Sequence, residues 1–119
     1  MNYMQFDQEL RRAIELVIRA IQTYEYNAPV MGKVSNEEYK QYHANLYQLW
    51  KIYKKLTYAS VVSMNEQADL ANSDLDDILQ ELNNFIISID GNVSNVAIAN
   101  QALDYLTKLL QICTIIFGL

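Results

Sequence analysis

The chain has 119 residues, about half of them apolar, with a net charge of −5, one cysteine, three glycines and one proline. This length predicts one domain over residues 1–119 with a single core, and the apolar content excludes a disordered protein. So few glycines and prolines disfavour a fold with many tight turns, which favours helices.

No run of about 18 apolar residues exists, so we expect no membrane span. The single cysteine allows no intrachain disulfide and the N-terminus shows no signal-peptide pattern, so we expect a cytoplasmic location.

Charge is divided unevenly along the chain. Residues 1–60 hold eight Lys and Arg against six Asp and Glu, a balance of +2. Residues 61–119 hold one lysine against eight acidic residues, a balance of −7. This pattern indicates two mildly basic helices beside two acidic ones, and it can also orient the protein towards itself or a partner.

Residues 1–26 have the spacing of an amphipathic helix, and the pair Glu15 and Arg19 is placed to support it. Pro29 disfavours helical geometry at the residue before it, so the helix should end near Asn27. The linker 27–34 contains apolar residues and is expected to fold back over the end of the bundle. The apolar positions alternate in steps of four and three: Leu10, Ile14, Val17, Ile21 and Tyr24.

The second segment is the centre of the predicted fold. Ser35 and Glu38 form a capping box, so the helix should begin at about Asn36 and run at least to Val62. Tyr47 and Trp50 are expected to widen its buried stripe, with the lysines mostly off it. The stripe itself consists of Tyr39, Tyr42, Leu46, Leu49, Tyr53, Leu56 and Ser60. For residues 63–72 we expect a break or kink near 63–65 and a short helical connector; an uninterrupted helix is the alternative.

Two further helices follow. The third should begin at Ser73 as cap and end at Asp90-Gly91-Asn92, because glycine suits the left-handed residue past a helix end. The fourth should begin around Ser94 or Asn95. Their stripes are Leu75, Ile78, Leu82, Phe85 and Ile89, then Ala99, Ala102, Leu106, Leu109, Cys113 and Ile116. Four such segments with short linkers predict an all-α fold, an antiparallel bundle of about four helices.

The residues that carry chemistry do not form a catalytic pattern. His43 is the only histidine, and Cys113 lies in an apolar stripe, where burial would make its thiol inert. There is no glycine-rich phosphate loop. The acidic residues Asp74, Asp76, Asp77 and Glu81 are interpreted as helix capping and solvation, with a carboxylate metal site as the alternative. We therefore predict a protein that is not an enzyme and that uses no cofactor or metal.

What remains is interaction. The last turns of the chain are apolar nearly all round, which is typical of an interface. The predicted interface residues are Leu109, Ile112, Ile115, Ile116, Phe117 and Leu119. The alternative is that this tail tucks under the 27–34 loop. We expect a homodimer or larger assembly that also binds another protein, as a structural subunit, adaptor or inhibitor of a larger machine. The short chain, rich in Tyr, Asn, Gln and Ile, favours a viral, phage or mobile-element origin, and so a host cytoplasm.

A nucleic-acid-binding subunit of a ribonucleoprotein complex is the alternative function. Its basic and aromatic patch on the second helix would consist of Lys40, Lys51, Lys54 and Lys55, interleaved with Tyr47, Trp50, Tyr53 and Tyr58. The acidic net charge and the core-like spacing of the aromatic residues weigh against it.

Overall fold

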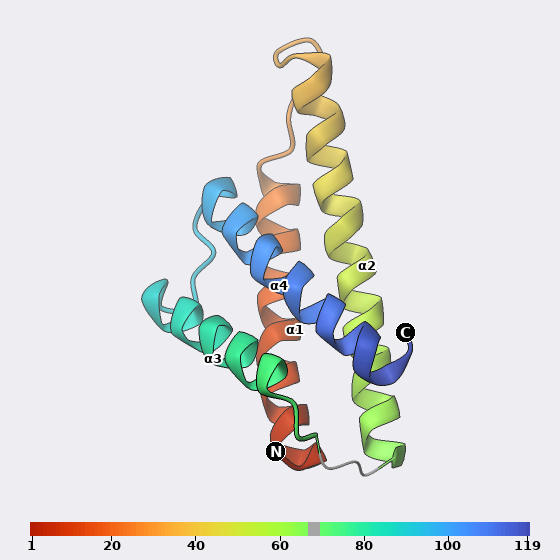
Figure 1. The fold of residues 1–119 in the computed structure, drawn as a ribbon. Helices are drawn as coiled ribbons and strands as arrows, with labels where there is room; N and C mark the ends of the chain where they lie inside the picture. The colour runs from red at the N-terminus through yellow and green to blue at the C-terminus, as the bar shows by residue number, and fades with distance from the viewer. Residues whose placement is uncertain (67–69) are drawn as a thin grey trace.

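The computed structural model describes residues 1–66 and 70–119, which contain four helices and no strand. The helices are α1 (Tyr3–Tyr26), α2 (Asn36–Glu66), α3 (Ser73–Ser88) and α4 (Val96–Phe117). Figure 1 shows α1 and α2 running in opposite directions, with α4 crossing them diagonally and α3 antiparallel to α4. The predicted all-α antiparallel bundle is confirmed. None of the described helices is long and apolar enough to cross a membrane.

Asparagine side chains begin three of the helices. The side chains of Asn2, Asn72 and Asn95 each accept a backbone N–H three residues on, which satisfies a donor that the helix leaves unpaired. Ser35 does the same for α2, accepting the amide of Glu38 at 3.1 Å. The predicted cap of α3, Ser73, was one residue too late, because Asn72 lies in the extended conformation that a cap requires.

The end of α3 matches its predicted stop. Gly91 has φ +66°, and its N–H donates to the carbonyl of Ile86 at 2.8 Å. Side chains rarely adopt this left-handed conformation, so glycine is favoured there. The turn also receives the guanidinium of Arg19, which donates to the carbonyl of Gly91 and joins the α3–α4 connection to α1.

All four helices contribute to one buried cluster. The predicted stripes of α1, α3 and α4 supply half of it and are confirmed, with Ile14, Ile89 and Ile116 partly buried against it. On α2 the buried residues are Leu49, Ile52, Leu56, Ala59 and Ser63. This stripe shares two positions with the predicted one but turns towards Ile52 and Ala59, because α2 packs against α1 and α4 and makes no contact with α3 in the described part of the chain.

Two predicted features of α2 were wrong. Tyr47 and Trp50 do not widen the buried stripe: Tyr47 is 72% exposed and Trp50 is 44% exposed. No break occurs at 63–65 either, since the helix continues to Glu66, and Ser63 stays buried with its hydroxyl donating to the carbonyl of Ser60. Residues 67–69 of the expected connector lie outside the described residues, and residues 70–72 are not helical.

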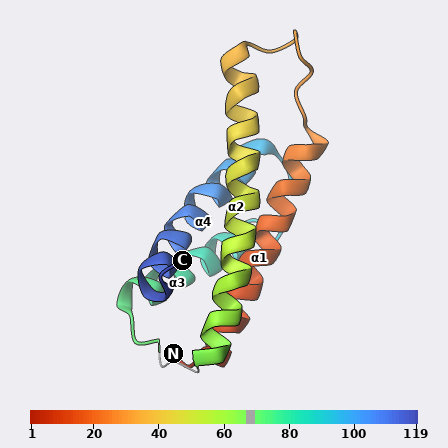
Figure 2. The same ribbon diagram turned by 90° about the vertical axis from the view of Figure 1, so that its right-hand side faces the viewer.

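The linker after α1 also differs from its prediction. Figures 1 and 2 show it at the tip of the molecule, where the first turns of α2 extend past the end of α1. Val30 and Met31 are exposed instead of covering the bundle. The C-terminal tail lies near the opposite end, so it does not tuck under this loop (Figure 2).

Candidate interaction surface

The outer side of α2 carries a continuous row of cationic and aromatic side chains. We call this surface the α2 face, and it consists of Lys40, Tyr47, Trp50, Lys51, Lys54 and Tyr58, all of them exposed. At 100° per residue, these positions fall on the side of the helix opposite Leu49, Ile52 and Leu56. Lys40 and Tyr58 are 18 residues apart, so the face is about 27 Å long.

The lysines of the α2 face are free to bind an external anion. From Lys40 to Asn65 the chain holds four lysines and no acidic residue. None of the four pairs with a described carboxylate. The arginines differ, because all three are held on α1: Arg11 by Asp7 at 2.8 Å, Arg12 by Glu9 at 3.9 Å and Arg19 by Glu15 at 2.8 Å. The last of these pairs was predicted.

The aromatic residues of the α2 face present their rings to solvent. Tyr58 is 59% exposed, close to the value of Tyr47. Trp50 is held edge-on against the ring of Tyr53, with centroids 5.9 Å apart and an interplanar angle of 82°. A large aromatic group that is exposed but fixed in position loses little conformational freedom when a partner covers it.

The predicted patch residues therefore come together only in part. Lys40, Lys51 and Lys54 share the α2 face, whereas Lys55 is half-buried at its margin. Tyr53, expected among the interleaved aromatic residues, packs against the core.

The predicted C-terminal interface is mostly covered within the chain. Leu109 is fully buried, and the ring of Phe117 lies 5.5 Å from that of Phe6 on α1. Ile112, Ile116 and Leu119 are partly buried against the core. Only Ile115 is fully presented to solvent, with 82% of its surface exposed. One exposed isoleucine is too little for an interface by itself, so the α2 face is the stronger candidate surface.

The groups considered for catalysis and metal binding are isolated from one another. His43 is exposed, between the rings of Tyr39 and Tyr42. Burial raises the pKa of the Cys113 thiol to about 12, so the thiolate is scarce at neutral pH. Among the described residues, no three His, Cys, Asp or Glu side chains are grouped closely enough to hold a metal ion.

A hydrogen-bonded cluster links three helices at the inner edge of α2. The hydroxyl of Tyr24 donates to Asn100 Oδ1 and accepts from Asn45 Nδ2 at 3.1 Å. The Tyr42 hydroxyl donates to the backbone carbonyl of Tyr24. Burial raises the pKa of both tyrosines. These partners are 21 and 76 residues away from Tyr24, so sequence spacing gave no sign of them; the cluster fixes α2 against α1 and α4.

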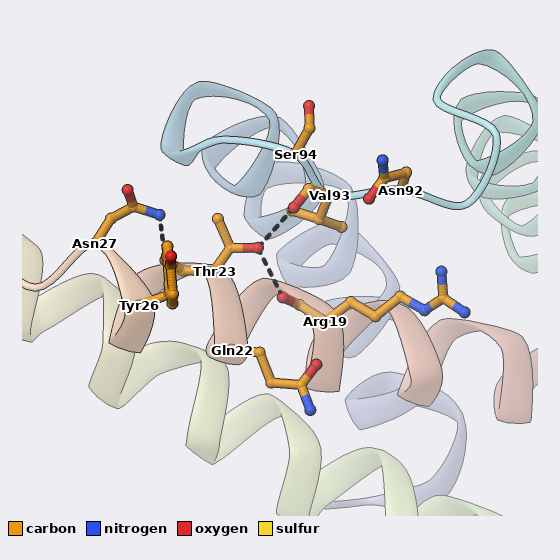
Figure 3. A pocket seen from close by; sticks show the side chains of 8 residues that line it. All are labelled: Arg19, Gln22, Thr23, Tyr26, Asn27, Asn92, Val93 and Ser94. Atoms are coloured by element: carbon orange, nitrogen blue, oxygen red, sulfur yellow. Dashed lines mark hydrogen bonds between the residues drawn. The ribbon is translucent and has the colours of Figure 1, made fainter.

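A separate surface depression lies between the end of α1 and the α3–α4 connection. Its volume is about 740 Å³ and it is open to solvent. Figure 3 shows the Thr23 hydroxyl between the backbone carbonyls of Arg19 and Val93, which share its single proton in a three-centre hydrogen bond. The Asn27 side chain is similarly engaged, with the carbonyl of Thr23. Arg19, Thr23 and Asn27 are thus engaged within the chain, whereas the side chains of Gln22, Tyr26, Asn92 and Ser94 form no hydrogen bond with a described residue.

No family model, curated protein or solved structure matches this chain.

Proposed function

We propose that this protein is a non-enzymatic protein–protein interaction module that binds an acidic protein surface on its α2 face. It would act as a structural subunit, adaptor or inhibitor of a larger machine. The observation that carries the proposal is the exposure of Tyr47, Trp50 and Tyr58 among lysines without ion-pair partners in the described chain. Tyrosine and tryptophan dominate binding energy at protein interfaces, and surrounding charges select the partner and its orientation.

A nucleic-acid partner is the second candidate, because unpaired lysines beside exposed aromatic rings also suit phosphates and bases. Two features favour a protein instead. The α2 face is the convex side of one helix, whereas single strands are usually held in a positively charged groove. The chain is also acidic overall, and its arginines are engaged on α1.

Site-specific photo-crosslinking tests the proposal. A photoreactive phenylalanine analogue replaces Tyr47 or Tyr58 in cells that naturally produce the chain, and Tyr26 serves as the control. Tyr26 is 91% exposed but lies at the C-terminal end of α1, in the depression beside Asn92 and Ser94, and is not part of the α2 face. We expect the analogue at position 47 or 58 to form protein adducts, and these adducts to be lost in the Lys51→Gln/Lys54→Gln variant. Any adducts formed from position 26 should be the same with and without this double substitution.

Other outcomes would overturn the proposal. Equal adducts from all three positions would mean that the α2 face has no special role. Nuclease-sensitive adducts would favour the second candidate. Gel shifts at two salt concentrations would then show binding that weakens steeply with salt and is lost when Lys51, Lys54 and Lys55 are all replaced.

A further inference from the structure

We infer that the acidic surface bound by the α2 face is the α3 side of a second copy of this chain, so that the protein associates head to tail. The inference rests on the proposed function, since it names the partner of the same face.

The outer side of α3 is negatively charged, whereas the α2 face is positively charged. Its acidic residues are all exposed and form no ion pair with a described residue: Asp74, Asp76, Asp77 and Glu81. The helix carries no Lys or Arg. Glu81 and Asp104 of α4 also line an open depression of about 590 Å³ between the two helices. The lysine there, Lys108, lies over the ring of Tyr105, 5.8 Å from its centroid.

The two surfaces also match in scale. Lys51 and Lys54 of the α2 face lie about 4.5 Å apart along the axis of α2, and Asp77 and Glu81 lie about 6 Å apart along α3. An exposed apolar residue accompanies each charge cluster, since Ile87 on α3 is largely exposed and Trp50 adjoins Lys51. Apolar contact is needed as well, because exposed charge pairs alone contribute little in physiological salt.

The fold decides the kind of assembly. In the described chain α2 and α3 do not touch; each packs on α1 and α4, which lie between them (Figures 1 and 2). Their outer sides therefore face away from each other. A two-fold dimer would bring the same patch of both copies together, whereas this contact joins two different patches. Each added copy leaves one α2 face and one α3 side open, so association continues beyond a dimer unless a ring closes.

Two complementary variants test this arrangement. Lys51→Gln/Lys54→Gln removes the basic patch, and Asp77→Asn/Glu81→Gln removes the acidic one. In sedimentation velocity at low salt, we expect the wild type to form larger species with rising concentration. Each variant should associate roughly tenfold or more weakly. An equimolar mixture should form a one-to-one dimer and stop, because only one complete contact remains. Lys33→Gln, on the α1–α2 loop, removes one lysine outside both surfaces and serves as the control, which should assemble as the wild type does.

A wild type that remains a monomer at every concentration would overturn the inference, as would variants that assemble normally or a mixture that stays monomeric. Fluorescein-labelled poly-L-glutamate separates this failure from failure of the proposed function. If a monomeric wild type binds this probe and Lys51→Gln/Lys54→Gln does not, the α2 face still binds an acidic partner and only the self-association is excluded. If neither binds, both proposals fail.

Discussion

At the scale of single residues, several polar side chains fix one helix against another. Asp7 on α1 illustrates this. Its carboxylate accepts a hydrogen bond from the Ser60 hydroxyl of α2 and another from Arg11 Nε at 2.8 Å. These contacts, the one from Ser60 foremost, lower the pKa of Asp7 below its ordinary value.

The lowered pKa predicts a pH-dependent contribution to stability. A carboxyl whose pKa is lower in the folded than in the unfolded state stabilises the fold above the unfolded value, about 3.9, and this contribution is lost as the pH falls through the folded value. We expect Ser60→Ala to lower the free energy of unfolding by about 1 kcal/mol at pH 7. The difference should shrink towards pH 3, as measured by urea unfolding at both pH values.

Thr57→Ala is the matched control for this prediction. The Thr57 hydroxyl is on the same helix but donates only to the carbonyl of Tyr53. Its removal should therefore have the same small effect at both pH values. An equal loss at pH 7 and pH 3 for Ser60→Ala would mean that its hydroxyl does not act through the charge of Asp7.

At the scale of elements, sequence periodicity correctly predicted which side of a helix is buried where other helices pack against that side. The stripes of α1, α3 and α4 could be predicted because each of these helices has one apolar side, and that side is buried. The cap Asn72 was missed because asparagine, serine and aspartate near a helix start are chemically equivalent as acceptors, and backbone conformation chooses between them. The cap Asn2 was missed because the first helix was predicted to include residues 1 and 2.

The α2 helix could not be predicted in the same way, because aromatic residues occur on both of its sides. Tyr42 and Tyr53 pack against the core, whereas Tyr47 and Tyr58 face solvent. Spacing alone cannot tell a buried tyrosine from one kept for a partner. The candidate surface therefore appeared in the sequence as lysines interleaved with aromatic residues, and only the packing of α1 and α4 showed that Tyr53 and Lys55 do not belong to it.

The packing of α2 predicts unequal costs for two neighbouring leucines. Leu49 is fully buried and Leu46 only partly. Leu49→Ala should reduce the free energy of unfolding by about 2–5 kcal/mol, as is typical of buried leucines, and Leu46→Ala by less. Tyr47→Ala, between them in sequence but exposed, should change it by under about 0.5 kcal/mol. Chemical unfolding followed by circular dichroism measures all three. Equal losses at 46 and 49 would contradict the observed orientation of the helix.

At the scale of the whole molecule, the start of α1 lies at one end of an elongated body of 51 × 28 × 19 Å, and the end of α4 packs against it. The ring of Phe117 packs on Phe6, and the carbonyl of Met1 accepts the N–H of Leu70 at 2.8 Å. The opposite end is formed by the α1–α2 loop and the first turns of α2. The apolar C-terminal tail, which suggested self-association from sequence, thus has a partner in its own α1.

This arrangement predicts opposite results for two adjacent isoleucines of the tail. Ile116 is partly buried against the core and Ile115 is exposed. Ile116→Asp places a charge against the core and should lower the free energy of unfolding by about 2 kcal/mol, since burying an isoleucine contributes about 1.5–3 kcal/mol. Ile115→Asp makes the same chemical change one residue away and should leave stability and oligomeric state unchanged. Urea unfolding and light scattering on both variants decide the matter. If Ile115→Asp dissociated an assembly that the wild type forms, the C-terminal tail would be an interface between copies. Self-association through the α2 face would then be contradicted.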